Sequence, residues 1–272
     1  MISYMNVTQK KLEVINPGLK DYINDYYVFE FESELPNNFT FKVPPTGFPT
    51  MLFCFGNKMN FFQHKHLTNE SIIVGQLSKH INLHPVTGTK IFGVNFKPYG
   101  FYNLFNKSLK DLKNSAIESS VIFDGESITF IEELLTKNCP INDVMYSIES
   151  LLLFHKKEAV KNDFFDGIVD EIVKMNGLAD PFQMATKNAS IRSFQRYFNE
   201  VIGINPKVFC QVLRHKFILQ LLYMNPDLKW NELILGGYYY DYSHFQKDFL
   251  KFTDVKPIDY LPYINPFAQK LL

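Results

Sequence analysis

The order of apolar and polar residues changes part-way along the chain. From Tyr22 to about Pro98, short apolar runs with partial alternation, such as YYVFEF, PTMLFCF and KIFGVNF, are separated by turn residues. Alternation with a period of two, interrupted by Pro and Gly, is typical of antiparallel strands. We therefore expect a β domain of sandwich or barrel type in this part of the chain.

After Tyr99 the apolar residues follow the helical period instead. Helices are expected at 100–105, 125–137 and 141–157, and the charged stretch HKKEAVKND at 155–163 is the expected linker. Everything beyond it has a helical pattern. The expected fold class is α+β multidomain, with a β-rich sensor or dimerisation domain and its C-terminal helices at 1–157, and an all-α double helix-turn-helix domain at 163–272.

Local signals set the expected ends of the helices in the second half. Pro206 and Pro257 are each expected to open a helix, because proline is favoured at the first helical position. Side chains that can accept a hydrogen bond from the first turn are expected to cap four helices. These residues are Asp163, Asp180, Ser190 and Asn231.

The helix expected at 141–157 has an apolar stripe formed by Val144, Ile148, Leu151 and Leu152. Such a stripe either packs on the sheet of its own chain or pairs with the same stripe of a second copy. The second alternative would make the chain a homodimer.

One stretch of the helical half occurs twice, 51 residues apart. SIRSFQRYFNEVIGINPKVF at 190–209 aligns without a gap with DYSHFQKDFLKFTDVKPIDY at 241–260. Each copy predicts a short helix, a tight turn and a longer helix, with Ala185 or Gly236 as the small residue where the two helices cross. This arrangement is that of a helix-turn-helix.

The longer helix of each copy has an apolar face and a polar face. Polar faces are common on solvated helices, but the same polar class at the same positions in two copies favours a binding surface. Arg, Gln, Asn and Ser are side chains that hydrogen-bond base edges, and Lys and Tyr can hold phosphates. The outward residues are Arg192, Gln195, Arg196 and Asn199 in the first copy, and Tyr242, Ser243, Gln246 and Lys247 in the second.

Composition neither requires nor excludes a polyanionic partner. Lys plus Arg equals Asp plus Glu at 28 each, and counting from Asp163 the balance is 12 against 12. A DNA-binding surface would therefore have to focus its charge on one side. All three arginines lie beyond residue 190.

Three widely spaced cysteines are typical of reduced thiols rather than of a disulfide framework. The N-terminus has no signal pattern, and no apolar run approaches the ~20 residues of a membrane span. We expect a cytoplasmic protein with no membrane contact.

The repeated stretches resemble the AraC family of bacterial transcription regulators over about Phe164 to Tyr260. SIRSFQRYFNEVIGINPKVFCQVLR is similar to the first recognition helix and the start of the linker helix, and DYSHFQKDFLKFTDVKP is similar to the second unit. The resemblance implies two helix-turn-helix units that bind double-stranded DNA. In two departures from the family pattern, a glycine stands one position early, as Gly237, and Asp254 replaces the usual exit glycine.

The expected roles divide between base edges and phosphates. Arg192, Gln195 and Arg196 are assigned to bases, and Lys247 with the turn tyrosine Tyr239 to the phosphate backbone. One of the tyrosines at 238–240 is expected between the helices. His244 matches a histidine of the family and is expected to be structural rather than a pH sensor. The expected DNA-binding residues are Ser190, Arg192, Ser193, Gln195, Arg196, Asn199, Tyr239, Tyr242, Ser243, His244, Gln246 and Lys247.

The N-terminal half resembles an uncharacterised, distantly cupin-like domain found in some members of the family. The resemblance rests on PTGFPTMLFCFGN and on IIVGQLSKHINLHPVTGTKIFGVNFKPYGFYNLF, and it implies a small-molecule sensor. His64, His66 and Glu70 are candidate metal ligands, because alternate strand residues point the same way. Their spacing to Gly56 and Gly75 differs from the cupin pattern, and HKHLTNE is also typical of a hairpin tip, so we expect no metal.

Motifs for nucleophilic or phosphate-transfer chemistry are absent from the sequence. We expect no catalytic residues, no cofactor and no enzyme activity. The expected function is a DNA-binding transcription regulator with a small-molecule effector. Two alternatives stay open: a cupin-type metalloprotein with a degenerate helical domain, and a relative that uses the helical domain for protein contacts instead of DNA.

Overall fold

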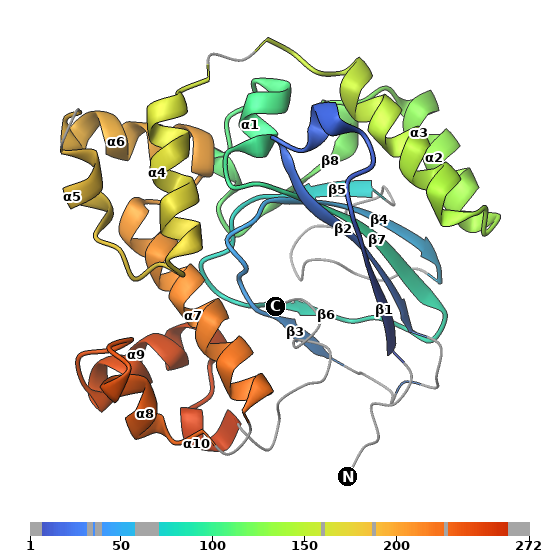
Figure 1. The fold of residues 1–272 in the computed structure, drawn as a ribbon. Coiled ribbons are helices and arrows are strands. Elements are labelled where there is room, and N and C mark those ends of the chain that lie inside the picture. The colour runs from blue at the N-terminus through green and yellow to red at the C-terminus, as the bar shows by residue number, and fades with distance from the viewer. Residues whose placement is uncertain are drawn as a thin grey trace.

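The computed structural model describes residues 7–31, 35, 40–57, 71–158, 161–186, 189–225 and 228–260. Its N-terminal half is built on an antiparallel six-stranded sheet of order β1-β2-β7-β4-β5-β8, with a separate two-stranded sheet of β3 and β6 (Figure 1). The prediction of antiparallel strands in this half is confirmed. The strands are β1 (Val7–Leu12), β2 (Ile23–Phe31), β3 (Phe41–Val43), β4 (Thr50–Gly56), β5 (Ser71–Val74), β6 (Ile81–Leu83), β7 (Thr89–Phe96) and β8 (Ala116–Glu118).

The six-stranded sheet is covered on both faces, which explains why its strands are more continuously apolar than simple alternation requires. Successive residues point to opposite faces, so Tyr26 belongs to one core and Tyr27 to the other. The first core lies between the sheet and the helices α2 (Gly125–Thr136) and α3 (Ile141–Phe154). The second lies between the sheet and the β3–β6 pair.

The apolar stripe of α3 is buried in the first of these cores. Its four residues are at most 8% exposed, and they pack with β-sheet residues of the same chain. The stripe therefore packs on its own sheet, and the alternative in which it pairs with a second copy is wrong. Helical periodicity predicted that this face is covered without indicating what covers it.

Short elements complete the N-terminal half and join it to the helices that follow. α3 ends at Phe154, the next helix begins at Asp163, and the backbone N–H of Lys157 in this connection donates to Leu104 O at 2.8 Å. The remaining elements before the connection are η1 (Pro17–Leu19), α1 (Gly100–Phe105), η2 (Lys110–Leu112) and η3 (Ser119–Val121).

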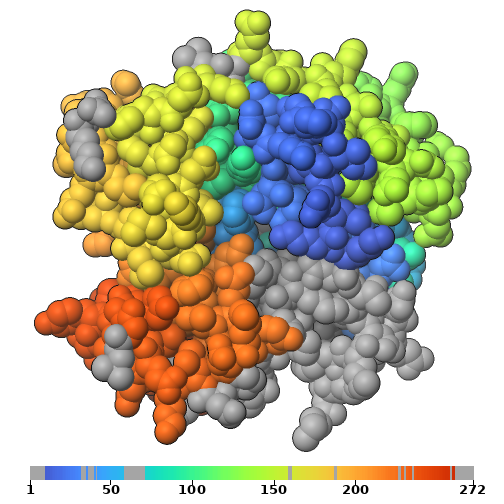
Figure 2. Space-filling model, in the orientation of Figure 1, coloured from blue at the N-terminus to red at the C-terminus, as the bar shows by residue number. Residues whose placement is uncertain are grey.

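The second half is helical among the described residues and lies beside the sheet (Figure 1). In the space-filling view its atoms pack against those of the N-terminal half (Figure 2). Its centre is α7 (Pro206–Met224), whose 19 residues span ~28 Å at 1.5 Å per residue. The first part of α7 contributes Phe209 and Leu213 to one core, and the last part contributes Ile218 and Leu222 to another. The other helices are α4 (Asp163–Lys174), α5 (Pro181–Ala185), α6 (Ile191–Tyr197), η4 (Phe198–Ile202), α8 (Trp230–Leu235), α9 (Tyr242–Thr253) and α10 (Pro257–Tyr260).

The helix ends confirm some of the predicted caps and correct others. Asp180 and Ser190 cap α5 and α6, and Pro206 and Pro257 open α7 and α10 as expected. Asp163 is not a cap. The cap of α4 is the preceding residue, Asn162, whose side chain accepts a hydrogen bond from the Phe165 N–H. Asn231 is not a cap either, since α8 begins at Trp230. Among the described residues, no helix is both long and apolar enough to cross a membrane.

Gly93 of β7 provides a test of the second core. It is paired with Tyr27 of β2, and a Cβ at this position would lie 2.1 Å from the Tyr27 ring, so the ring packs directly over the glycine. Gly93→Ala is expected to destabilise the chain by ~1–3 kcal/mol, because the buried ring must move. Urea denaturation measures this free energy.

Gly125→Ala is the matched control, because nothing lies within 4 Å of its Cβ position. It is expected to change the free energy of unfolding by less than ~0.5 kcal/mol. Equal small effects of the two substitutions would show that Tyr27 does not pack over β7.

Candidate nucleic-acid interface

The first helix-turn-helix, here called unit one, consists of α5, α6 and η4. The Asp180 side chain accepts the Phe182 and Gln183 N–H groups, and the Ser190 hydroxyl accepts the Ser193 N–H, so both helices begin at a satisfied cap. Ala185 is buried, as expected for a residue where two helices cross. The four outward residues of unit one predicted from the sequence, Arg192, Gln195, Arg196 and Asn199, are all exposed.

The second helix-turn-helix, unit two, consists of α8 and α9. Asp241 caps α9 through its carboxylate, which accepts the His244 N–H at 2.7 Å. Three phenylalanines, Phe245, Phe249 and Phe252, are fully buried on the inner face of α9. Tyr242, Ser243, His244 and Lys247 are exposed on the outer face, and Gln246 is half-buried.

The tyrosines of the turn in unit two separate into buried and exposed rings. Tyr239 is 4% exposed, its ring packs 5.2 Å from that of Phe245, and the Arg214 guanidinium lies 5.5 Å from its centroid. Burial raises the pKa of the Tyr239 hydroxyl. Tyr240, in contrast, is 90% exposed. The assignment of Tyr239 to a phosphate is therefore wrong, because its side chain is in the core of unit two.

A polar network that was not predicted from the sequence joins α9 to α7. Asp248 is buried and lies 3.8 Å from His244 Nε2, so this histidine has a carboxylate partner one turn away. Gln211 of α7 donates to Asp248 at 3.3 Å and accepts from Lys251 at 2.9 Å. The signal in the sequence was the carboxylate at the edge of the phenylalanine stripe, four residues after His244.

Unit one is attached to the N-terminal half through buried polar contacts. Asp166 of α4 is buried and accepts hydrogen bonds from Asn103 Nδ2 at 2.8 Å and from the Tyr197 hydroxyl. Burial raises the pKa of this carboxyl, although both hydrogen bonds oppose the shift. The Tyr99 hydroxyl donates to Asp170 at 2.9 Å.

Backbone contacts reinforce this attachment. The carbonyl of Glu200 in η4 accepts from the Leu109 N–H and from the Ser108 hydroxyl, each at 3.0 Å. A Cβ at Gly203 would lie 2.8 Å from Leu109 O, so the two backbones meet closely. Unit one is thus fixed to the N-terminal half at several points, of which the Asn103–Asp166 hydrogen bond is buried.

A pocket lies between the six-stranded sheet and the β3–β6 pair. It encloses about 660 Å³ of space that protein atoms do not fill, including solvent at its mouth. Ligand sites commonly combine an apolar lining with few polar groups. The lining fits that description: it is mainly apolar, with Tyr27, Thr46, Thr50 and Asn95 contributing polar atoms.

A lysine of α7 lies beside this pocket. Lys216 Nζ is 4.7 Å from the ring centroid of Phe48, which lines the pocket. Burial lowers the pKa of this ammonium to about 8. Among the described residues no carboxylate lies within ion-pair distance of it. The site therefore combines an apolar cavity with a cation whose contact in the described part of the chain is the Phe48 ring, while the charge of Asp25 partly opposes the lowering of its pKa.

Metal ligands cannot be assembled from the described part of the chain. No three His, Cys, Asp or Glu side chains there are grouped to hold an ion. His64, His66 and Glu70 lie outside the described residues, so the expectation of no metal stays a prediction.

One family model matches part of the N-terminal half. The model of a domain of unknown function, DUF6597, matches residues 16–118. No curated protein matches the chain.

The solved structures that resemble the chain include ToxT from Vibrio cholerae O395, with 10% identity, 96% of this chain and 98% of that chain covered, and a TM-score of 0.44. The same protein bound to (E)-4-(8-methylnaphthalen-1-yl)but-3-enoic acid has 12% identity, coverage of 96% and 99%, and a TM-score of 0.46. Unsaturated fatty acid bound wild-type ToxT from Vibrio cholerae strain SCE256 has 9% identity, coverage of 94% of each chain and a TM-score of 0.44.

Asp166 provides a test of how unit one is attached. Asp166→Ala is expected to lower the free energy of unfolding by ~1–3 kcal/mol, because Asn103 and Tyr197 would lose their buried acceptor. Chemical denaturation checks this. Glu171→Ala is the control, since it removes a carboxylate of the same helix whose partner Lys174 is a surface lysine 3.8 Å away. If both variants lose the same small amount, Asp166 does not hold unit one in place.

Proposed function

We propose that the chain is a sequence-specific, DNA-binding transcription regulator of the AraC type. One observation carries this proposal: two capped recognition helices, α6 and α9, have polar side chains at three equivalent positions of the repeat. The pairs are Arg192 and Ser243, Gln195 and Gln246, and Arg196 and Lys247, and all of these side chains are exposed except the half-buried Gln246. A solvated helix needs no such correspondence. The partner is double-stranded DNA, because these side chains suit base edges and phosphates.

The spacing of the two units fits successive turns of a duplex. α7, which joins the two units, spans ~28 Å, and successive major-groove faces of DNA lie ~34 Å apart. The widths of the recognition helices at its two ends, α6 and α9, account for the remaining distance. Because the two units have different side chains, one chain would bind a non-palindromic site with two contact segments about one turn apart.

The two recognition helices have different roles in this proposal. Arg192, Gln195 and Arg196 of α6 read bases, because arginine and glutamine can form paired hydrogen bonds with base edges. Lys247 of α9 and the exposed Tyr240 hold phosphates. Tyr240 replaces Tyr239 in this role because its ring is at the surface.

The proposed effector is a small apolar molecule with an anionic group. The pocket supplies the apolar lining, and Lys216 beside Phe48 supplies the cation. Burying a charge without a partner is costly, so an anion that pairs with this ammonium would bind with a compensating gain. The apolar body of the effector would then fill the space between β2 and β6.

The DNA-binding proposal is tested by selection from random duplexes followed by titration at two salt concentrations. Arg196→Ala is expected to cost ~1–3 kcal/mol and to relax the preference at one base position. Lys247→Ala is expected to weaken binding to all DNA sequences alike. It should also reduce the salt dependence of the binding affinity by the equivalent of about one phosphate contact.

Lys174→Ala is the control, because it removes an exposed cation from α4 rather than from a recognition helix. The roles are wrongly assigned if Arg196→Ala leaves affinity and preference unchanged while Lys247→Ala alters base preference. A wild-type chain that selects no sequence would favour the alternative in which the helical domain contacts proteins.

The effector proposal predicts a particular pH dependence. Lys216 is mainly protonated below pH 8, so the anionic probe 8-anilinonaphthalene-1-sulfonate should bind better there and lose affinity as pH rises through about 8. Between pH 7 and 9 the expected loss is about tenfold, since about a tenth of Lys216 keeps its proton at pH 9. Fluorescence titration measures it.

Two controls isolate the charge. The uncharged analogue N-phenyl-1-naphthylamine should bind without this pH dependence, and Lys216→Met should remove it for the sulfonate. Lys207→Met, which alters an exposed lysine of the same helix, should preserve it. A sulfonate affinity that is unchanged from pH 7 to 9 would exclude Lys216 as the anion-binding group.

A further inference from the structure

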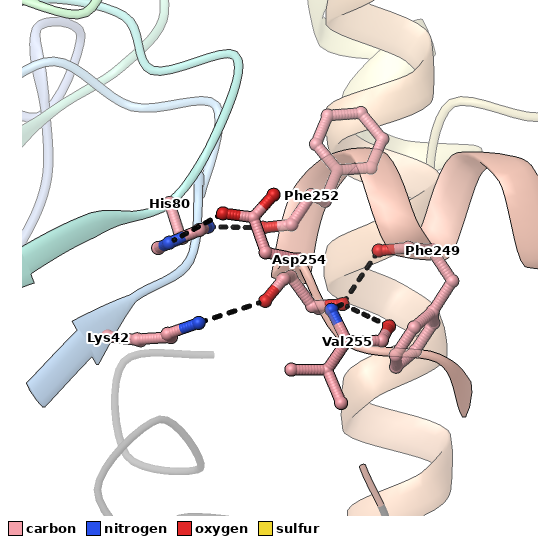
Figure 3. Close-up of polar contacts among 7 residues, drawn as sticks. Lys42, His80, Phe249, Phe252, Asp254 and Val255 are labelled. Carbon is pink, nitrogen blue, oxygen red and sulfur yellow. Dashed lines mark hydrogen bonds and ion pairs between the residues drawn. The ribbon is translucent and has the colours of Figure 1, made fainter. Parts of the chain in front are cut away.

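Two residues of the β3–β6 pair and its entry contact the end of the second recognition helix. Lys42 Nζ of β3 donates to Thr253 O at 3.4 Å (Figure 3). His80, directly before β6, has Nδ1 3.3 Å from Phe252 O and Nε2 3.4 Å from Asp254 Oδ2. We call these contacts of Lys42 and His80 with residues 252–254 the clasp.

The clasp holds the backbone of α9. The last carbonyl groups of a helix have no partner within the helix and form the negative end of its dipole. A lysine ammonium and an imidazole N–H complement both properties. Lys42 and His80 therefore donate to the backbone carbonyl groups of Thr253 and Phe252, which have no hydrogen-bond donor within the helix.

Asp254 adds a side chain from unit two to the clasp. Because the Nδ1–H of His80 faces Phe252 O, Nε2 can donate to the Asp254 carboxylate only when the ring is protonated, and burial lowers the pKa of His80. The backbone of Asp254 has φ of 55°, in the left-handed region, where a residue other than glycine is under strain. Glycine would adopt this turn without strain, but glycine has no side chain that could contact His80 as the Asp254 carboxylate does. The Asp254 side chain is 70% exposed and that of His80 is 10% exposed, so the contact lies where the two halves of the chain meet the solvent.

The clasp leaves the reading face of α9 free. Tyr242, Ser243 and Lys247 lie in the first half of the helix and are exposed, whereas the clasp binds its last turn. The clasp thus sets the angle of α9 without covering the surface that would meet DNA.

The two units differ in how they are attached to the N-terminal half. Unit one shares a core with Tyr99 and Tyr102 of the N-terminal half and has the buried contacts of Asp166 and Glu200. The core of unit two draws its described residues from α7 onward. Within the described part of the chain, the polar contacts of the clasp join this unit to the β3–β6 pair.

The strands of the clasp also form a wall of the pocket. Val43 and Ile81 line the pocket, and they are the direct neighbours of Lys42 and His80 in the sequence. Neighbouring residues of a strand point to opposite faces. The β3–β6 pair therefore has pocket lining on one side and the clasp on the other.

We propose that the clasp is a conformational switch that couples occupancy of the pocket to the position of unit two. A ligand that displaces the β3–β6 pair changes the contacts of Lys42 and His80 with α9, while unit one stays attached. Two arrangements of α9 relative to α6 result, and a ligand that prefers one of them shifts the population. As a form of regulation, this inference rests on the proposed DNA-binding function.

The experiment measures distances in the full chain by pulsed electron spin resonance. A spin label at Tyr146→Cys on α3 is paired with one at Glu232→Cys on α8 or at Gln183→Cys on α5, all at exposed positions. Cys139→Ser removes the accessible native thiol, since Cys54 and Cys210 are buried. The first pair reports unit two and the second pair reports unit one.

Breaking the clasp should release unit two alone. In the double variant Lys42→Ala, His80→Ala, the distance distribution to Glu232→Cys should broaden at least about twofold, and that to Gln183→Cys should stay unchanged. Asp254→Gly, which preserves the turn, should broaden the first distribution to a smaller extent. Lys79→Ala is the control, because it removes an exposed charge beside His80 without removing a contact of the clasp.

A second arm tests the coupling to the pocket. Val43→Phe adds bulk on the pocket side of β3 and should change the distance to Glu232→Cys without changing that to Gln183→Cys. Ile117→Phe is the matched control, since Ile117 is also half-buried but packs against the core on the helix side of the sheet. No change with Val43→Phe, or an equal change at both label pairs, would overturn the coupling.

The outcome is separable from that of the proposed function. If the clasp variants release unit two but the wild-type chain selects no DNA sequence, the switch stands and the proposed function fails. If the chain binds DNA while the double variant leaves both distance distributions unchanged, the proposed function stands and the switch is wrong.

Discussion

The structure depends on α7, because this one helix packs in the cores of both helix-turn-helix units and also contacts the β domain. Phe209 and Leu213 pack in the core of unit one, and Ile218 and Leu222 in that of unit two. A Cβ at Gly47 would lie 2.8 Å from Leu213 Cδ2, so the loop after β3 rests directly on the helix. Any movement of unit two relative to unit one must therefore bend or rotate the last part of α7.

His215 stands near the middle of α7, between the residues that serve the two cores. Its ring is fully buried and stacks on Phe252 at 4.8 Å, and neither ring nitrogen has a partner within the described residues. Burial lowers its pKa to about 3, so the ring is neutral near pH 7. An unsatisfied polar ring in a core is destabilising. Within the described residues, α7 thus has buried polar atoms without hydrogen-bond partners near the point where the two units meet.

Local features of the sequence predicted the parts of the fold that depend on local interactions. Asp180 and Ser190 were recognised as caps because a cap needs only its own side chain and the next turn. The inner phenylalanines of α9 followed from helical spacing. Tyr239 was misassigned because three consecutive tyrosines in a turn do not indicate which ring faces inward. The clasp was beyond prediction, since Lys42 and Thr253 are separated by 211 positions and neither belongs to a motif.

The left-handed conformation of Asp254 restricts how this contact can change during evolution. Most side chains are strained at a φ of 55°, and glycine and asparagine are the replacements that tolerate it best. Both are reached from an aspartate codon by a single nucleotide substitution. Glycine would remove the carboxylate, and asparagine would preserve its shape without its charge. Mutation can therefore adjust the strength of the contact between the two halves of the chain while the turn after α9 is preserved.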